Sequence, residues 1–167
     1  MKSFPIRSVQ RTINGLNNLT QPIQLYNIYL MLNIEQIRPE LTWRLRREVL
    51  YPESPLYEME MEEDSYGYHF GAFKDNDLVA VVSLFQDGTD FQFRKFAVVA
   101  EAQGIGVGKA LLNYITDFAI AEGAQRIWCN ARVSAIGFYL RFGFVGTGKL
   151  FSKNGFDYEI MEKIIRP

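Results

Sequence analysis

Cysteine and histidine are almost absent from this sequence of 167 residues, each occurring once, as Cys129 and His69. A single cysteine excludes an internal disulfide framework and a cysteine-rich zinc site. A single histidine argues against a catalytic zinc of the histidine-rich kind. We therefore expect no metal cofactor, and we expect Cys129, within an apolar segment, to be an inert buried thiol.

An excess of charge of either sign is also missing. The chain has 18 Lys and Arg against 19 Asp and Glu, a formal net charge of −1. Nucleic-acid binding in general requires a basic footprint, so we expect no nucleic-acid partner. The apolar share of 48% is typical of a globular domain, and the length is too short for a two-domain dehydrogenase.

The first 34 residues contain no acidic side chain, since Glu35 is the first. Three interpretations compete: a targeting peptide, a disordered or loosely docked arm, or an artefact of start-site choice, because Met31 would also serve as an initiator. The last two are favoured. We therefore predict an N-terminal extension over residues 1–30 and a single domain over residues 31–167.

A long hydrophobic run is lacking as well. Residues 25–34 are apolar, but the segment is short and is interrupted by Asn27 and Asn33. A membrane-spanning helix needs about 20 apolar residues, and no apolar run precedes a small-residue cleavage site of the secretory kind. The sequence predicts a soluble cytoplasmic protein without a membrane partner.

From residue 32 onward, hydropathy patterns predict strands and helices in a mixed order. The expected strands cover 32–37, 68–73, 78–85, 91–99, 126–131, 144–147 and 158–164, and the expected helices cover 39–49, 104–122 and 134–142. Ser134 is expected to cap the last helix, and the acid-rich stretch 58–64 is expected to be a solvated loop. The order predicts an α/β protein with a central twisted sheet and helices on both faces.

A glycine-rich turn, residues 103–109 (QGIGVGK), joins the strand ending at Val99 to the long helix. Alternating glycines allow close backbone approach to a ligand, and a helix N-terminus favours a phosphate. Two familiar phosphate motifs fail. The third glycine comes one residue early for a dinucleotide fingerprint, and Gln103 and Ala110 occupy positions where a P-loop needs Gly and Ser or Thr. A turn that only packs the helix on the strand is the simpler alternative.

Two segments together carry a family resemblance. Residues 103–108 fit the pattern [RQ]-x-x-G-x-[GA], and residues 135–144 (AIGFYLRFGF) fit A-x-x-F-Y-x-x-x-G-F. In this order and at this separation they resemble motifs of the GCN5-related N-acetyltransferase (GNAT) superfamily. The resemblance covers residues 32–165 in element order. Residues 45–52 and 68–71 are similar to a small bacterial branch of uncharacterised members.

The resemblance implies a GNAT-like, mostly antiparallel twisted sheet with helices on both faces. Its strands 91–99 and 126–131 would be a splayed parallel pair that holds acetyl-CoA, the acetyl donor. The pantetheine arm would lie beside the end of the first strand and the pyrophosphate on the glycine-rich turn. A bulge near Phe96 and Ala97 would free a backbone N–H for the thioester carbonyl. The implied cofactor-binding residues are Ala97, Val98, Val99, Gln103, Gly104, Ile105, Gly106, Val107, Gly108 and Lys109.

Three further residues receive roles from the resemblance. Tyr139 matches the tyrosine that protonates the departing CoA thiolate; the alternative is a core aromatic. Many members carry Asn where this chain has Arg132, and Asn130, two residues earlier, is expected to serve CoA instead. Arg132 is expected to pair with a ligand phosphate or carboxylate, or else to be a surface cation.

The general base is not evident, because the strand segment 91–96 contains no carboxylate. The remaining candidates are Glu48, Glu53, His69 and Glu159, and His69 is more simply a partly buried strand residue. The acidic stretch 58–64 either attracts a cationic amine or is a solvated face.

The leading hypothesis is an N-acetyltransferase that moves the acetyl group of acetyl-CoA to a primary amine of an unknown small molecule or peptide. The amine would attack directly in a ternary complex. The alternative is a non-catalytic acetyl-CoA-binding sensor or interaction module, suggested by the missing strand carboxylate and the acid-free N-terminus. A third hypothesis is another acyl donor or acceptor on the same scaffold. A homodimer through the final strands or the sheet edges is left open.

Overall fold

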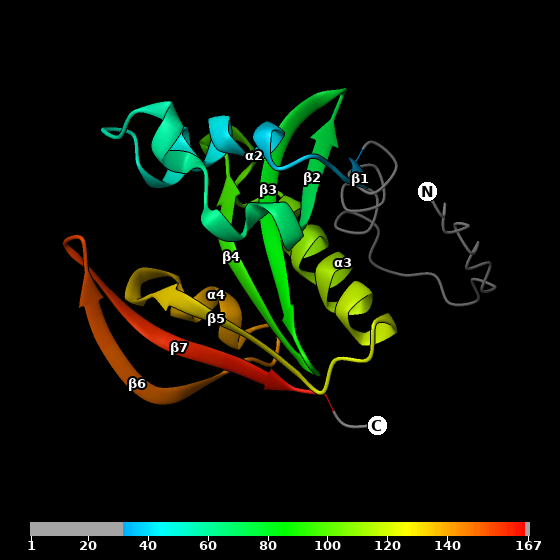
Figure 1. The fold of residues 1–167 in the computed structure, drawn as a ribbon, viewed down its shortest axis with the longest axis vertical. Coiled ribbons are helices and arrows are strands. Elements are labelled where there is room, and N and C mark those ends of the chain that lie inside the picture. Colours follow the sequence, from blue (N-terminus) through cyan, green and yellow to red (C-terminus); the bar gives the residue numbers. More distant parts are fainter. Residues whose placement is uncertain (1–31, 166–167) are drawn as a thin grey trace, which may run out of the picture.

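The computed structural model describes residues 32–165, and the predicted extension over residues 1–30 lies outside them (Figure 1). A seven-stranded sheet has the order β1-β2-β3-β4-β5-β7-β6, and only its β4–β5 pair is parallel. The strands are β1 Leu32–Gln36, β2 Tyr68–Lys74, β3 Asp77–Asp87, β4 Asp90–Val98, β5 Arg126–Arg132, β6 Val145–Lys153 and β7 Phe156–Ile164. The mixed, mostly antiparallel sheet predicted from the sequence is confirmed.

The helices are short except for one. They are α2 Glu40–Leu45, α3 Val107–Ala121 and α4 Ile136–Leu140, with a π-helical turn at Arg46–Leu50 and 3-10 turns at Leu56–Met59, Glu62–Tyr66, Ala100–Ala102 and Val133–Ala135. The predicted first helix is confirmed as α2 running directly into the π-helical turn. The expectation of a solvated loop over 58–64 holds for Glu58, Glu60 and Glu62, which are exposed, and is wrong for Asp64, which is buried; the stretch forms parts of two 3-10 turns.

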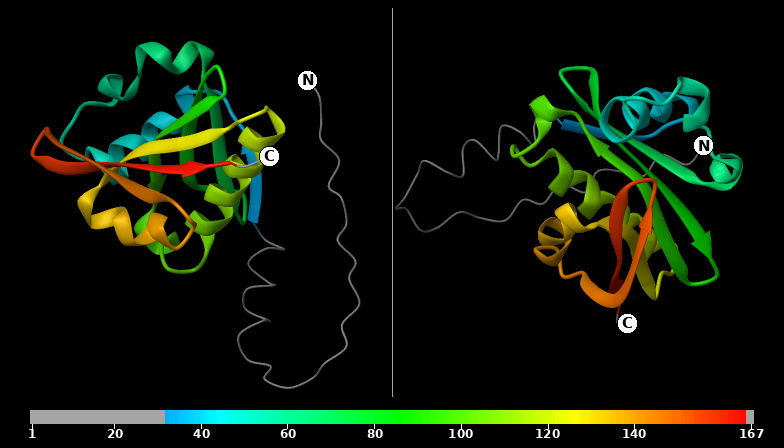
Figure 2. Two further views of the ribbon diagram at one scale, coloured as in Figure 1. Left: turned by 90° about the horizontal axis from the view of Figure 1, so that it is seen from below. Right: turned by 90° about the vertical axis from the view of Figure 1, so that its left-hand side faces the viewer.

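Helices cover both faces of the sheet, as predicted (Figure 2). On one face, α3 buries Val107, Leu111 and Ile115 at helical spacing against apolar side chains of β2, β3 and β4. On the other face, Leu45 of α2 packs with Val81 and Ala97. Burial of each apolar side chain of this size stabilises the fold by about 2 kcal/mol, so the two clusters fix the sheet between the helices.

Strands β4 and β5 separate soon after they begin to pair. Their register runs only from the pair Asp90 and Arg126 to the pair Gln92 and Trp128, after which β5 continues alongside β7. Figure 1 shows β4 rising beside β3 while β5 leans away with β7. The predicted splayed parallel pair is therefore present, and it leaves a backbone edge of β4 without a strand partner beyond Gln92.

A β-bulge interrupts β4 just past this point. Val81 pairs with Ala97 and Ser83 pairs with Arg94, so two residues of β4, Lys95 and Phe96, lie opposite one residue of β3. The backbone of Lys95 has a φ of 57°. The bulge was predicted near Phe96 and Ala97 and occurs one residue earlier.

The ends of the helices are set by glycines. Gly106 precedes α3 with a φ of 98°, and Gly123 follows it with a φ of 88°. The predicted cap at Ser134 is wrong, because a 3-10 turn intervenes and α4 begins at Ile136 without a side-chain cap.

Within residues 32–165, no helix combines the length and the hydropathy that crossing a membrane requires.

Candidate active site

The glycine-rich turn presents a cluster of backbone donors. Gly104 and Gly106 adopt φ values of 74° and 98°, which residues with a Cβ rarely adopt. The N–H of Ala110 donates to the carbonyl of Gly106 over 3.0 Å. The N–H groups at positions 107–109 precede this first helical bond and have no partner within the helix. The turn can therefore bind an anion at the N-terminus of α3.

A pocket of about 480 Å³ lies beside this turn, and we call it the turn pocket. It is lined by Val49, Phe96, Val98, Gln103, Gly104, Gly106, Gly108, Lys109, Ala135, Phe138, Tyr139, Arg141 and Phe142. Ten residues of the strand and the turn were predicted to bind acetyl-CoA, and six of them line this pocket: Val98, Gln103, Gly104, Gly106, Gly108 and Lys109. Arg141 and Lys109 add two cations beside the anion-binding turn. The sequence reasoning missed Arg141, although it lies inside the second motif, two residues after Tyr139.

Gln103 fixes the turn to the end of β4. Its amide Nε2 donates to the carbonyl of Val98 over 2.9 Å. This bond joins the first residue of the glycine motif to the strand along which the pantetheine arm is predicted to lie. Ala97, by contrast, is buried against Leu45 and Val81, so only its backbone is available there.

A second pocket of about 160 Å³ lies between the splayed strands, and we call it the throat. It is lined by Leu50, Tyr51, Phe93, Arg94, Lys95, Phe96, Cys129, Asn130, Arg132, Ala135, Tyr139 and Tyr158. Phe96, Ala135 and Tyr139 line the turn pocket as well. A ligand that lies in the turn pocket can therefore reach the throat at Tyr139.

Tyr139 is held at this junction by aromatic packing. Its ring lies 5.6 Å from that of Phe93 and 5.9 Å from that of Phe144, measured between centroids. Burial, and to a lesser extent the neighbouring Cys129, raises the pKa of the phenol far above its usual value. Burial also raises the pKa of the Cys129 thiol. Tyr139 is thus both a core aromatic and a protonated phenol that lines two pockets, and Cys129 is buried, as expected from the sequence.

The third pocket, of about 270 Å³, opens on the far side of the throat, and we call it the outer pocket. Its lining comprises Tyr51, Ser54, Glu58, Met59, Phe93, Arg94, Lys95, Asn130, Phe151, Lys153, Asn154 and Tyr158. Residues of the loop before β2 and of the tip of the β6–β7 hairpin belong to this lining, and both segments lie at the left of the ribbon in Figure 1. The predicted CoA residue Asn130 lines this pocket and the throat, and Arg132 lines the throat. Neither lines the turn pocket.

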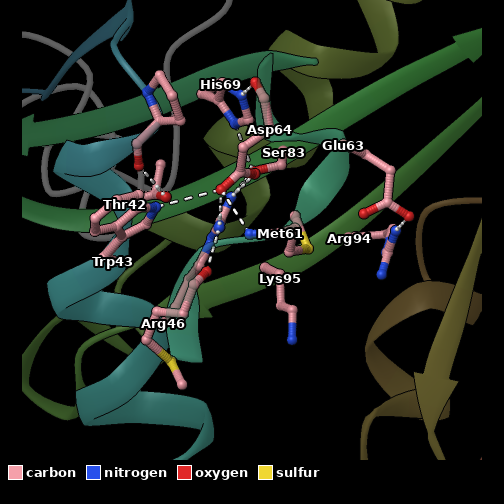
Figure 3. A network of polar contacts seen from close by, with 12 residues as sticks. Thr42, Trp43, Arg46, Met61, Glu63, Asp64, His69, Ser83, Arg94 and Lys95 are labelled. Carbon is pink, nitrogen blue, oxygen red and sulfur yellow. Dashed lines mark hydrogen bonds and ion pairs between the residues drawn. The ribbon is translucent and has the colours of Figure 1, made fainter. Parts of the chain in front are cut away.

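A buried ion pair holds the loop that forms one wall of the outer pocket (Figure 3). The fully buried Arg46 donates to both carboxylate oxygens of Asp64, over 2.7 and 2.8 Å. The same guanidinium donates to the carbonyl of Met59 over 2.7 Å. Burial alone would raise the pKa of Asp64, but Arg46 and the backbone N–H of Met61 hold it below its usual value. The pair therefore fixes the loop next to Glu58 in a single position.

His69 completes this network rather than the reactive site. Arg46 donates to the Ser83 hydroxyl over 2.7 Å, and His69 Nδ1 lies 2.8 Å from the same hydroxyl. His69 Nε2 lies 2.8 Å from the carbonyl oxygen of Asp64, so Nε2 carries the proton and Ser83 donates to Nδ1. Burial lowers the pKa of His69 and keeps the ring neutral. The interpretation of His69 as a structural strand residue agrees with these contacts.

The candidate bases from the sequence do not gather at the throat. None of Glu48, Glu53, His69 and Glu159 lines any of the three pockets. Glu48 pairs with Arg44, and Glu159 accepts a bond from the N–H of Gly148. Glu58 is the one carboxylate among the lining residues of the three pockets.

A known protein family matches the chain over most of its length. The model of the acetyltransferase (GNAT) domain family matches residues 37–165, most of the chain. The chain belongs to the GNAT acetyltransferase family. The chain is therefore an acetyl-CoA-dependent N-acetyltransferase.

Relatives of known sequence or structure agree with this GNAT assignment. The uncharacterised N-acetyltransferase YitI of Bacillus subtilis is 25% identical over 146 residues, which are 81% of this chain and 98% of the relative. A putative N-acetyltransferase of Lactobacillus plantarum superposes with a TM-score of 0.71 at 18% identity, over 80% of this chain and 97% of its own. A GNAT acetyltransferase of Elizabethkingia anophelis with acetyl-CoA bound superposes with a TM-score of 0.65 at 17% identity, over 81% of this chain and 99% of its own. The structural likenesses show that the fold is shared.

Proposed function

We propose that the protein acetylates a primary amine of a small molecule or peptide by direct attack on acetyl-CoA in a ternary complex. The observation that carries this proposal is the throat, which joins the turn pocket to the outer pocket between β4 and β5. A donor on one side and an acceptor on the other can meet there without a covalent enzyme intermediate. The buried thiol of Cys129 supplies no nucleophile for such an intermediate.

Acetyl-CoA would supply the activated acetyl group from the turn pocket. The N–H groups of the turn and the cations Lys109 and Arg141 would hold its pyrophosphate. The pantetheine arm would follow the backbone edge of β4 from Val99 to Ala97, which β5 leaves unpaired. The backbone at the Lys95–Phe96 bulge would donate to the thioester carbonyl as its oxygen gains charge.

Tyr139 would act as the general acid. When the amine nitrogen attacks the carbonyl carbon, a C–N bond forms, the C–S bond breaks, and the CoA sulfur leaves as a thiolate. The phenol gives its proton to this sulfur. Its raised pKa keeps it protonated until that step, and no side chain among residues 32–165 holds the hydroxyl in a hydrogen bond.

The proton that the attacking amine loses cannot go to a carboxylate of β4, because residues 91–96 contain none. Arg94, Lys95 and Arg132 line the throat, and cations beside an amine favour its neutral, nucleophilic form. A neutral amine needs less help from a general base when it attacks the carbonyl carbon. Glu58, in the outer pocket, would take the proton through water.

Substitution of Tyr139 by Phe tests this assignment. We expect Tyr139→Phe to lower kcat about 100-fold while the Kd for acetyl-CoA stays within about twofold, because only proton transfer is lost. The assay follows CoA thiol release with amino acids, aromatic amines, polyamines and lysine peptides as acceptors. Tyr114→Phe, on the exposed side of α3, is the matched control. Wild-type turnover by Tyr139→Phe would remove the tyrosine from the mechanism. Acetyl-CoA binding without turnover of any amine would favour the non-catalytic sensor instead.

A further inference from the structure

The outer pocket carries positive charge that the protein does not neutralise. We propose that the acceptor amine also carries a carboxylate, which these cations bind, and that an aromatic or apolar group joins the two. This inference rests on the proposed acetyl transfer and names the acceptor class. The carboxylate would bind in the outer pocket, on the opposite side of the throat from acetyl-CoA.

Three cations around the throat and the outer pocket have no carboxylate within 4.0 Å among residues 32–165: Lys95, Arg132 and Lys153. Lys95 Nζ donates to the Tyr51 hydroxyl over 3.0 Å and lies 4.1 Å from the centroid of that ring. The Arg132 guanidinium lies 3.8 Å from the centroid of Phe156. Aromatic contacts of this kind position a cation and leave its charge available to an anion.

The acidic stretch before β2 does not balance these charges. Asp64 is committed to Arg46 inside the fold, and Glu63 accepts from Arg94 over 2.8 Å. Among residues 32–165, Glu58 is the only carboxylate that lines the outer pocket, and it faces two lysines without a carboxylate partner, Lys95 and Lys153. A polycationic acceptor would be repelled there, so the hypothesis that the stretch 58–64 attracts a cationic amine is not favoured.

The bulge in β4 brings Lys95 to the same side of the strand as its neighbour Arg94. Consecutive residues of a regular strand point to opposite faces, yet Arg94 and Lys95 both line the throat and the outer pocket. Lys95 does so with a φ of 57°, a backbone conformation that costs free energy in a residue with a Cβ and persists mainly at functional sites. In Figure 3 the Lys95 side chain extends away from the Arg46–Asp64 pair.

Aromatic side chains form the rest of the walls. Tyr51, Phe93, Phe151 and Tyr158 all line the outer pocket. The rings of Phe151 and Tyr158 are stacked, 5.2 Å apart at an interplanar angle of 10°, at the tip of the β6–β7 hairpin. Flat apolar walls favour a ring or an apolar chain between the amine, in the throat, and the carboxylate, between Lys95 and Lys153.

The test compares three acceptors that differ in one group. The full-length protein is assayed at saturating acetyl-CoA with L-phenylalanine, with 2-phenylethylamine, which lacks the carboxylate, and with the phosphonate analogue of phenylalanine. We expect kcat/KM for phenylalanine to exceed that for phenylethylamine by about 10-fold or more, as a charge-assisted hydrogen bond implies. A carboxylate site would also prefer phenylalanine to the phosphonate.

Four variants at three lysines assign the preference to residues. Lys153→Gln removes one charge, and Lys95→Asn removes the other with a residue that tolerates positive φ. Each is expected to reduce the phenylalanine to phenylethylamine ratio about 10-fold, and Lys95→Arg is expected to restore it. Lys149→Gln, on the same strand as Lys153 but outside every pocket described above, should leave the ratio unchanged.

The outcomes separate this inference from the proposed function. Equal use of phenylalanine and phenylethylamine, or a ratio unaffected by Lys95→Asn and Lys153→Gln, would overturn the carboxylate site and leave acetyl transfer standing. A preference for the phosphonate would replace the carboxylate by a phosphate-like anion and overturn the class named here. If no amine of any kind were acetylated by a protein that binds acetyl-CoA, the proposed function would fall, and this inference with it.

Discussion

Removing the charge of Asp64 should destabilise the fold far more than removing the charge of Glu63. Both carboxylates lie in the same 3-10 turn, and each accepts from one arginine. Asp64→Asn leaves the fully buried Arg46 without a counter-charge, which costs about 3–5 kcal/mol. Glu63 and Arg94 are each about one-third exposed to solvent, and breaking their pair costs about 0.5 kcal/mol.

Urea unfolding measures the difference. With a slope of about 2 kcal/mol per molar, typical of a domain of this size, Asp64→Asn should lower the unfolding midpoint by about 1.5–2.5 M, and Glu63→Gln by about 0.3 M. The double variant Arg46→Met/Asp64→Leu should recover much of the loss, because no buried charge remains. A midpoint for Asp64→Asn equal to that of Glu63→Gln would refute the reasoning.

The same pair predicts a dependence on pH. The pKa of Asp64 is lower in the folded protein than its usual value of 3.8, so the unfolded state binds the proton more tightly. The stability that Asp64 contributes is therefore complete above pH 3.8 and is lost as the pH falls below it. The difference in unfolding free energy between wild type and Asp64→Asn should shrink below this pH. A constant difference from pH 7 to pH 2.5 would contradict the assignment.

Three further outcomes are expected. Gly106→Ala places a Cβ on a residue with a φ of 98°, although no atom beyond the two adjoining residues lies within 4 Å of that Cβ. The variant should therefore lose about 1 kcal/mol of unfolding free energy in urea and bind acetyl-CoA more weakly. The control Gly137→Ala, in α4 at an ordinary φ, should not weaken binding. Cys129 should resist iodoacetamide at pH 8 in the folded protein and react in urea, since burial raises its pKa; rapid labelling of the native thiol would contradict its burial. The kcat should not fall as the pH rises through 10, the usual pKa of a phenol, because burial raises the pKa of Tyr139; a fall with an apparent pKa near 10 would exclude a buried acid.

Much of the fold follows from local patterns in the sequence. The helical spacing of apolar residues predicts α3, and the turn between β2 and β3 uses Asp75 and Asn76, both at positive φ, which these residue types tolerate. The glycine-rich turn is predictable from its alternating glycines, and Gly104 and Gly106 adopt the positive φ that glycine tolerates. Local chemistry and global fold agree at these positions.

The buried ion pair was not predictable in this way. Arg46 and Asp64 are 18 residues apart, and charged residues in a charged stretch ordinarily indicate a solvated surface. Their burial depends on how α2 and the following loop pack on the sheet. The same holds for the outer pocket, whose walls come from a loop near residue 55, from β4 and from a hairpin tip near residue 153. The closing strand β6 also extends to Lys153, beyond the predicted end at residue 147.

The assignment of the site to acetyl transfer is tested by calorimetric titration of the full-length protein with acetyl-CoA, beside CoA and NAD. We expect one site per chain for acetyl-CoA and for CoA, and no binding of NAD, because the turn would hold a pyrophosphate while the splayed strands would select a pantetheine arm. A folded protein that bound neither CoA compound, or bound NAD equally well, would contradict the assignment of the glycine-rich turn and the throat to acetyl transfer.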